Sequence, residues 1–436
     1  MIDLFRDLYY TDRMKIDLGP FRGKKICVAL SGGGDSMALF DYLLRHAAEY
    51  SVDVCAAHLE HGIRGEQSKK DAAFVRAYCE KRRVILYEKS VNCPLYAAEH
   101  KTGLEEGARA LRYAFFAEVL KKGVDLVCTA HHADDNAETV LFNLFRGSAL
   151  KGAGGIAARQ GKIVRPMLGI GKEEISAYLA ENEIPFVEDE TNADTRYTRN
   201  FLRANVLPAV KEIFPACCER VYSFSRLARE DDEYLYELAE RPCRREEGLF
   251  TFPHDLPRPL FLRACVLAFH YLGGEKDYTQ QNCEDIYALR GAKNGAAVHL
   301  PFSLAAAREY DKIAVYRPRE KETAEYPFAA GEFSFGGKKL SIVRGELRGG
   351  LRFDGAKLPA GCVVRARREG DYFEKFGGGT KKLKDYFIDK KIPLRERDFI
   401  PLIARGSEVY AVCGVEISAK VKIDRDSGRI YTIILQ

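Results

Sequence analysis

The sequence predicts an α/β protein: a doubly wound parallel sheet comes first, followed by a small α-rich domain and a small α+β C-terminal domain. Two observations predict this class. Over the first two hundred residues, short apolar runs alternate with longer segments of helical periodicity, as in parallel strands joined by helices that cover both sheet faces. Further along, a helical stretch gives way to glycine-rich segments with short β-like runs. We therefore expect three domains, at residues 1–208, 209–325 and 326–436.

The first domain contains the apolar runs that we expect to form the parallel strands. These runs are residues 24–30 (KKICVAL), 52–59 (VDVCAAHL), 83–88 (RVILYE) and 125–130 (DLVCTA). The segments of helical periodicity are residues 36–50, 66–82 and 173–183. The segment before the last of these helices is expected to be a loop, because it contains Pro166, Gly169 and Gly171. The domain is expected to end near Leu207 and Pro208.

From Ala216 onward the pattern of the sequence changes. Helices are expected over residues 221–240 and 260–274, followed by short strands at 296–300 and 312–317. The C-terminal segment carries β-like runs around one helical stretch. The runs are residues 338–344, 362–367, 408–414 and 430–435, and the helical stretch is 381–391.

The composition excludes several classes of protein. With 46% hydrophobic and 30% charged residues, the chain can bury cores throughout, unlike a disordered or collagen-like chain. No apolar run approaches the ~20 residues that span a bilayer, and the charged N-terminal stretch does not resemble a secretory signal. The 12 cysteines form no Cys-x-x-Cys pair and mostly lie in apolar runs, as buried reduced thiols do. We expect a cytoplasmic protein with no membrane partner.

The net charge of +5 is concentrated near the C-terminus. Residues from Cys362 to Gln436 carry 16 Lys and Arg against 11 Asp and Glu, so their surplus of 5 equals that of the whole chain. Such a surplus suits a polyanion partner but is equally ordinary on a soluble surface. Composition leaves both interpretations open.

A glycine-rich turn directly follows the first expected strand and leads into the first helix. Its residues are Ser31, Gly32, Gly33, Gly34, Asp35 and Ser36. Glycines let the backbone approach an anion, and the N–H groups and dipole of a helix N-terminus favour negative charge. The turn therefore predicts a phosphate-binding loop at the carboxyl end of a parallel strand.

This loop lacks the lysine that ordinary phosphoryl transfer uses. A Walker A loop places a lysine after its last glycine to reach the β and γ phosphates, and G-x-x-x-x-G-K-[ST] occurs nowhere in the chain. Residues Gly152 to Ala157 fit the dinucleotide pattern G-x-G-x-x-A. No expected strand precedes them, so we interpret them as a loop.

Two carboxylates stand three positions apart at the start of the helix after the fourth strand. Asp135 and Glu138 share one helix face at the edge where strands end, and can hold Mg²⁺ or a substrate ammonium. For the neighbouring Asp134, helix capping and a functional role both stay open. The histidines at 58, 61, 131 and 132 lack a further ligand string, which disfavours a zinc site.

Two arginines suit an anion on a further short helix that we expect near the end of the first domain. Arg199 and Arg203 are four positions apart, so their guanidinium groups lie on one helix face. They could contact ATP phosphates, an RNA backbone or only solvent.

A lysine cluster in the C-terminal segment follows a run of glycines. Lys381, Lys382 and Lys384 stand beside Tyr386 and Phe387, and basic residues interleaved with aromatic ones suit an RNA stem end. The same stretch fits an amphipathic helix, and both interpretations can hold together. Its buried face would consist of Leu383, Phe387 and Ile388.

Several of these motifs resemble those of a known family. The loop from Ser31 to Ser36 resembles that of the N-type ATP pyrophosphatases, the PP-loop superfamily, which cleave ATP between the α and β phosphates. Further sequence motifs resemble those of the tRNA(Ile)-lysidine synthase family, and they occur in the same order and at similar spacing. They are His58–Arg64, Gly103–Arg109 with Arg112–Tyr113, His131–Thr139 with Arg146–Gly147, Asp189–Asn192 with Arg199–Arg203, Arg368–Asp371 and Lys381–Asp389. The resemblance is weakest from about Ala209 to Arg348.

The resemblance implies a fold and a reaction. The first domain would have the adenine nucleotide alpha hydrolase-like fold and would use ATP and Mg²⁺. The enzyme would be a ligase that joins L-lysine to C2 of the wobble cytidine of a tRNA(Ile) with anticodon CAU. An adenylated tRNA would be the intermediate, and pyrophosphate and AMP would be released. The third domain would bind the tRNA, and the oligomeric state stays open between a monomer and a homodimer.

The resemblance also implies roles for individual residues. Asp35, Asp135 and Glu138 would be catalytic, with Asp35 on the metal and the other two acids positioning the lysine. The ATP site would comprise Ser31, Gly32, Gly33, Gly34, Asp35, Ser36, His58 and Arg109. The tRNA and lysine would contact Arg112, His132, Arg199, Arg203, Lys381, Lys382 and Lys384.

The sequence departs from the family at two points. Gly34 stands where the family commonly has a different residue, and the run after Gly370 and Asp371 lacks the family's basic residue next to the aspartate.

Two other functions stay open. One is tRNA thiolation by the same adenylation chemistry, whose cluster-dependent branch is disfavoured by the absence of Cys-x-x-Cys. The other is a non-catalytic RNA-binding protein on the same fold.

Overall fold

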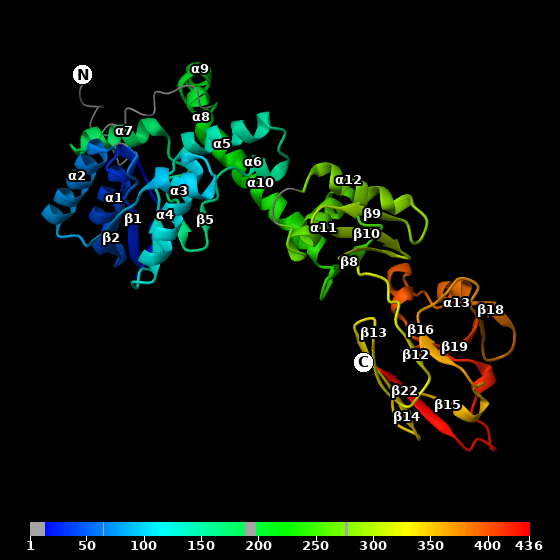
Figure 1. The fold of residues 1–436 in the computed structure, drawn as a ribbon. Helices are drawn as coiled ribbons and strands as arrows, with labels where there is room; N and C mark the ends of the chain where they lie inside the picture. Colours follow the sequence, from blue (N-terminus) through cyan, green and yellow to red (C-terminus); the bar gives the residue numbers. More distant parts are fainter. Residues whose placement is uncertain (1–13, 64, 188–197, 275–277) are drawn as a thin grey trace. The chain divides into compact units, whose positions relative to one another are not determined.

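The computed structural model of the chain describes residues 14–63, 65–187, 198–274 and 278–436. The chain divides into two compact units, and the division falls between Tyr234 and Leu235. This point lies inside helix α10 (Cys217–Glu240) (Figure 1). The expected domain boundaries after residues 208 and 325 stay predictions.

The first unit contains the expected parallel sheet. Its strands are β1 (Lys25–Ala29), β2 (Asp53–Glu60), β3 (Leu86–Ser90), β4 (Leu126–Cys128), β5 (Arg159–Gln160) and β6 (Ile163–Val164). They lie in the order β3-β2-β1-β4-β6-β5, and every pairing is parallel except that of β5 with β6. Strand β3 starts later than expected because Arg83, with a left-handed φ of 55°, first ends the preceding helix.

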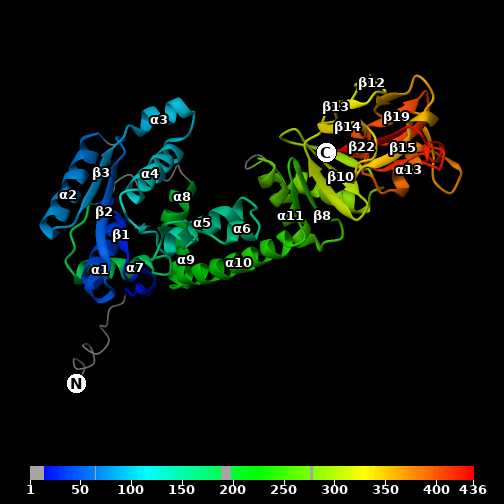
Figure 2. The same ribbon diagram turned by 90° about the horizontal axis from the view of Figure 1, so that it is seen from below.

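Helices cover both faces of this sheet, as the sequence predicts. Ile26 and Val28 of β1 join the core beneath α1 (Gly34–Tyr50) and α7 (Lys172–Glu181), whereas Cys27 between them joins the core beneath α4 (Leu104–Leu120). Figure 2 shows β1 to β3 between α2 (Glu66–Arg82) and α4. The other helical segments are a 3-10 turn (Gly19–Phe21), α3 (Cys93–His100), α5 (Ala133–Phe145), α6 (Leu150–Ala153), α8 (Thr198–Phe201), a π-helical turn (Leu202–Val206) and α9 (Leu207–Ile213).

The second unit begins with a sheet that the sequence predicts only in part. Its elements are β7 (Arg244–Glu246), β8 (Leu249–Pro253), α11 (Arg258–Tyr271), α12 (Gln280–Ala288), β9 (Ala297–Leu300), β10 (Leu304–Glu309) and β11 (Lys312–Tyr316). The antiparallel order is β7-β8-β11-β10-β9. Strands β9 and β11 were expected, but β7, β8 and β10 were not. Strand β8 is almost entirely buried, so it lacks the apolar-polar alternation that identifies a strand.

The C-terminal segment is α+β, as expected. Its elements are β12 (Glu325–Pro327), β13 (Gly331–Phe335), β14 (Lys338–Arg344), β15 (Leu351–Asp354), β16 (Val363–Arg365), β17 (Tyr372–Glu374), β18 (Thr380–Lys382), α13 (Leu383–Asp389), β19 (Leu402–Arg405), β20 (Glu408–Val412), β21 (Glu416–Ile417) and β22 (Ile430–Leu435). One sheet has the order β12-β16-β19-β20-β17-β18, with β21 on β20, and the other β13-β14-β22-β15. Both sheets contribute to one core, for example Val364 from the first and Ile342 from the second.

Two further expectations concern cysteines and membranes. All 12 cysteines are free, and all are buried except Cys217 and Cys243, which are half-buried. This confirms the interpretation of the cysteines as mostly buried thiols. Within the described ranges, no helix is long and apolar enough to cross a membrane.

Candidate active site

The glycine-rich loop between β1 and α1 is shaped by its own hydroxyl groups. Gly32 has a φ of 92°, a conformation that favours glycine. The Ser36 hydroxyl donates to the Gly33 carbonyl oxygen (2.9 Å) and lies 3.1 Å from the Ser31 hydroxyl oxygen, which accepts from the Gly33 N–H (3.3 Å). These bonds connect the two ends of the turn at the carboxyl end of β1.

The loop leaves backbone donors for an anion. Helix α1 starts at Gly34, so the N–H groups of Gly34, Asp35 and Ser36 have no acceptor within the helix. The N-cap residue Gly33 has no side chain to cap them. Free donors and the positive end of the helix dipole together favour a phosphate at this position, as the sequence predicts.

Asp35 is the charged residue of the loop, and two cations hold it. Its carboxylate accepts a hydrogen bond from Lys172 Nζ and lies 3.6 Å from Nε2 of His132. Burial raises the pKa of Asp35, but His132 and Lys172 outweigh burial and lower this pKa to about 2. Asp35 is therefore an anion at neutral pH.

His132 lies among three carboxylates at the start of α5. Its Nε2 is 3.6 Å from Asp35 and 3.6 Å from Asp135, and its Nδ1 is 3.7 Å from Asp134. Burial opposes the charge on this ring, but the three acids raise the pKa of His132 to about 10. The imidazolium thus holds the acids together.

Asp134 and Asp135 have different partners. Asp134 accepts a hydrogen bond from the Lys172 backbone N–H (3.0 Å) and another from Lys211 Nζ, and it thereby links α5 to α7 and α9. Asp135 accepts from the His132 backbone N–H (3.1 Å), so the helix-capping role falls to Asp135. Asp134 has a structural role that the sequence did not indicate.

Arg203 joins Asp135 and Glu138. Its Nε donates to Glu138 Oε1 (2.5 Å), and its Nη2 donates to Glu138 Oε2 and Asp135 Oδ1, both at 3.0 Å. The two carboxylates therefore face the same side, as their spacing predicts. Burial raises the pKa of Glu138, and the Arg203 guanidinium opposes this rise.

Arg199 does not share the partners of Arg203. It donates to Glu105 (2.9 Å) and lies 5.4 Å from the centre of the Phe142 ring. Arg199 belongs to α8 and Arg203 to the π-helical turn that follows, so the two arginines have different partners although they are four positions apart. Their contacts with ATP or RNA stay predictions.

His58 lies at the end of β2, beside the phosphate loop. Its Nδ1 lies 2.8 Å from the Leu30 carbonyl oxygen, a contact that requires the proton on Nδ1. The other ring nitrogen, Nε2, is buried and has no hydrogen-bond partner among the described residues. An unpartnered buried acceptor beside the loop suits a donor of a bound nucleotide.

Arg109 and Arg112 lie on α4, close to two neutral histidines. Burial, followed by Arg112 and His58, lowers the pKa of His61 to about 4. For His131, burial and the nearby arginines outweigh the attraction of Asp135 and lower the pKa to about 4. His61 and His131 are therefore neutral at neutral pH, and the positive charge near them is carried by arginines.

Lys172 and Lys211 belong to the site but were not predicted. Lys172 is the first residue of α7, and a cation at a helix N-terminus is disfavoured by the helix dipole. Its partner Asp35 is 137 positions away in the sequence, so no local pattern reveals the contact. Lys211 bonds Asp134 and Glu173 across separate helices, which no local pattern reveals.

Two parts of the resemblance lie outside the described residues: Arg64, the last residue of the His58–Arg64 string, and Asp189–Asn192. In the described part of the chain, no group of three or more His, Cys, Asp or Glu side chains could hold a metal ion.

The lysine cluster of the C-terminal segment differs from its predicted form. Lys381 and Lys382 lie on β18, and only Lys384 is on α13, because the strand pairs with β17 before the helix starts. Lys381 is bonded to Asp389. Lys382 and Lys384 are exposed and have no ion-pair partner among the described residues.

The aromatic residues of this cluster are part of the core. Tyr386 and Phe387 are buried, and the Tyr386 hydroxyl donates to Glu416 (2.8 Å), so neither ring is free to stack on a base. Leu383 is buried as expected, but Ile388 is exposed, which corrects the predicted apolar face. The exposed aromatic residue nearby is Phe376, in the loop between β17 and β18.

Asp371 of the Arg368–Asp371 string is a core residue. Its carboxylate accepts two bonds from Arg365, at 2.9 and 2.8 Å, and both side chains are almost fully buried. It also accepts from the Arg368 backbone N–H (2.7 Å). The string therefore shapes a turn of the fold.

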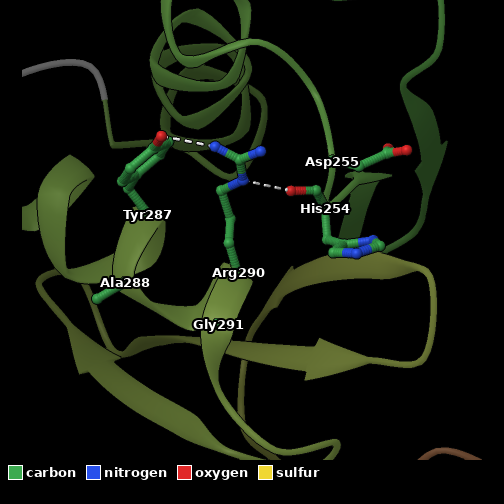
Figure 3. Close-up of a pocket in the computed structure, with 6 residues that line it drawn as sticks. All are labelled: His254, Asp255, Tyr287, Ala288, Arg290 and Gly291. Atoms are coloured by element: carbon green, nitrogen blue, oxygen red, sulfur yellow. Dashed lines mark hydrogen bonds between the residues drawn. The ribbon is translucent and has the colours of Figure 1, made fainter.

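A recess of about 450 Å³ lies in the second unit at the end of α12 (Figure 3). Its lining residues are His254, Asp255, Tyr287, Ala288, Arg290 and Gly291. Arg290 donates to the His254 carbonyl oxygen (2.9 Å) and to the Tyr287 hydroxyl (2.6 Å). This guanidinium ties the end of α12 to the loop after β8, and the sequence singled out none of the lining residues.

Comparison with protein families identifies two regions of the chain. Residues 8–210 match the family described as PP-loop domain, and residues 362–433 match the family described as TilS substrate C-terminal domain. The first match covers the phosphate loop and the acids of α5. The second covers the lysine cluster.

Curated relatives match the chain over nearly its whole length. A tRNA(Ile)-lysidine synthase of Caldanaerobacter subterraneus subsp. tengcongensis is 31% identical, over 94% of this chain and 93% of the relative. One from Clostridioides difficile is 33% identical, over 94% of this chain and 95% of its own length. One from Geobacillus kaustophilus is also 33% identical, over 95% of both chains.

Proposed function

The chain belongs to the tRNA(Ile)-lysidine synthase family, and from this premise we propose how its residues divide the reaction. The protein is a ligase of the PP-loop family that binds ATP and forms lysidine on tRNA(Ile). One observation carries the assignment to residues. The phosphate loop, Asp35 and the acids of α5 are connected by direct contacts through His132.

The loop would hold the pyrophosphate part of ATP. The free N–H groups at the start of α1 donate to phosphate oxygens, and the helix dipole favours their charge. His58 Nε2, buried without a partner in the described residues, would accept a hydrogen bond from the nucleotide. Arg109 on α4 would add positive charge on the side of the nucleotide.

Asp35 fits the requirements of a magnesium ligand. Mg²⁺ is usually held by one or two carboxylates together with substrate phosphates, and Asp35 is an anion beside the phosphate loop. When bound there, Mg²⁺ would offset the charge of the leaving pyrophosphate. His132 would hold the carboxylate of Asp35 in place.

The reaction would proceed in two steps on the wobble cytidine of a tRNA with anticodon CAU. The C2 oxygen attacks the α phosphorus of ATP, and pyrophosphate leaves. The neutral ε-amine of lysine then attacks C2, a carbon–nitrogen bond forms, and AMP leaves with the oxygen. An ammonium has no lone pair for this attack, so a lysine bound as ammonium must first lose one proton to water. The amine loses a further proton to water as the carbon–nitrogen bond forms.

Asp135 and Glu138 would position the lysine. Both carboxylates now bind Arg203, a cation of the kind that they would accept from the substrate. Lysine binding must therefore move Arg203 or share the carboxylate oxygens with it.

The tRNA would contact both units. Arg112 on α4 would face the anticodon end, near the reacting groups. In the C-terminal segment, Lys382 and Lys384 are exposed and suited to phosphates, and Phe376 is the exposed aromatic residue suited to a base. Arg199 and Lys381, both engaged in ion pairs, would make weaker contacts.

Pyrophosphate release tests the proposed function. We expect repeated release only when ATP, lysine and tRNA(Ile) are all present. With ATP and tRNA alone, at most one pyrophosphate should be released per enzyme, from a single adenylation. Pyrophosphate release that requires a sulfur donor instead of lysine would support thiolation. The absence of any pyrophosphate release would support a non-catalytic RNA-binding protein.

A further inference from the structure

The phosphate loop has no lysine of its own, yet a lysine contacts it. The Lys172 Nζ is hydrogen-bonded to Asp35, the second residue of α1, although the two residues are 137 positions apart. Lys172 is the first residue of α7. A cation thus reaches the loop from another helix.

Close packing holds α7 on the loop. A Cβ at Gly34 would lie 2.9 Å from Leu179 Cδ1 of α7 and 3.6 Å from the Phe186 ring. The Val187 N–H, shortly after α7, donates to the Gly32 carbonyl oxygen (2.9 Å). The absence of a side chain at Gly34 therefore permits the close approach of the helix that carries Lys172.

The backbone and side chain of Lys172 are held differently. Its backbone N–H is bonded to Asp134, which fixes the start of α7. Its side chain is 44% exposed and ends on Asp35, which is itself partly exposed. A flexible side chain on a fixed backbone can change its partner without moving the helix.

We propose that Lys172 is the phosphate-binding lysine that the loop lacks. Without nucleotide, its ammonium neutralises Asp35. With ATP bound, the ammonium turns to the pyrophosphate oxygens, which carry more negative charge than one carboxylate, and Asp35 becomes free for Mg²⁺. This inference rests on the proposed function only in placing pyrophosphate on the loop.

Inhibition by inorganic pyrophosphate and by AMP tests this inference, because AMP lacks the β and γ phosphates. In Lys172→Met, we expect the inhibition constant of pyrophosphate and the KM for ATP both to rise by about 10- to 100-fold, since one charge-assisted contact is lost. Inhibition by AMP should stay within about twofold of the unmodified protein. Lys172→Arg should restore most of the pyrophosphate affinity.

Lys162→Met is the matched control. Lys162 is exposed in the turn before β6, in the same unit, and its replacement should leave all three constants unchanged. Thermal unfolding of each variant reports whether α7 stays folded. Should Lys172→Met fail to fold, Lys172→Gln, whose amide can still donate to Asp35, serves for the same comparison.

Two results would overturn the inference. One is unchanged pyrophosphate inhibition in a folded Lys172→Met protein, and the other is equal weakening of pyrophosphate and AMP, which indicates a merely structural role. Failure of the proposed function is distinguishable, because the unmodified protein would then release no pyrophosphate with lysine and tRNA, while calorimetry still reports its binding of pyrophosphate.

Discussion

Charged side chains are arranged in opposite ways at the phosphate loop and in the C-terminal segment. At the loop, His132 and Glu138 are buried and Asp35 is only partly exposed, and each is held by groups of opposite charge. In the C-terminal segment, Lys382 and Lys384 are exposed and unpaired within the described residues, while Tyr386 and Phe387 beside them are buried. The first arrangement fixes a few charges for small ligands and reacting atoms. The second leaves charges available to a large, strongly charged partner.

The difference has a consequence for salt. Charges in water are screened over about 8 to 10 Å at physiological ionic strength, whereas buried pairs are screened much less. We therefore expect ATP and lysine binding to depend weakly on salt and tRNA binding to depend strongly on it. Variants in the two regions can test this comparison.

The largest effect is expected from Asp35→Ala. Its carboxylate would serve the metal and the pyrophosphate, so we expect adenylation to fall on the order of 1000-fold or more. Binding of tRNA should stay nearly intact, because the exposed lysines are unaffected. Normal AMP formation by this variant, measured with labelled ATP, would remove Asp35 from the reaction.

A smaller loss is expected from breaking the buried pair of the C-terminal segment. In Asp371→Ala, the Arg365 guanidinium remains buried without its partner, which should lower the free energy of unfolding by about 3 to 5 kcal/mol. Asp426→Ala removes an exposed carboxylate and is the matched control. Denaturant unfolding measures both, and equal stabilities would show that the pair has no structural role.

Glu138→Gln should separate lysine from ATP. The change removes a charge-assisted contact worth about 1.5 to 3 kcal/mol, so we expect the KM for lysine to rise roughly 10- to 150-fold and the KM for ATP to change little. Glu181→Gln, on the exposed face of α7, controls for the loss of a carboxylate. Similar increases for both substrates would assign Glu138 to the metal.

The smallest effect concerns the lysine cluster. Replacing Lys381, Lys382 and Lys384 with Ala should weaken tRNA binding and flatten its salt dependence by about 2 to 3 units of slope. Because Lys381 is bonded to Asp389, we expect Lys382 and Lys384 to provide most of this change. The double variant Lys121→Ala/Lys122→Ala, at the far end of α4, should leave the slope unchanged. If the salt dependence of tRNA binding has the same slope in the unaltered protein and in every variant, tRNA recognition lies elsewhere.

The sequence predicted the parts of the molecule that rest on local patterns. The parallel strands and the phosphate loop follow from apolar runs and glycines, and the shared face of Asp135 and Glu138 follows from helix periodicity. Contacts between distant elements could not be predicted in this way. The Lys211 bond to Asp134 and the burial of Tyr386 depend on how helices pack, and a basic-aromatic run does not show which of its side chains face the core.

The mass of the tRNA product tests the central claim most directly. The purified protein is incubated with ATP, L-lysine and a tRNA(Ile) transcript of anticodon CAU, and the nucleosides are then analysed by mass spectrometry. We predict one modified cytidine, at the wobble position, whose mass has increased by that of lysine less one water, with one AMP formed for each. No such nucleoside is expected from the Asp35→Ala protein. An unmodified wobble cytidine with the unaltered protein, or a cytidine that has gained sulfur, would contradict the account.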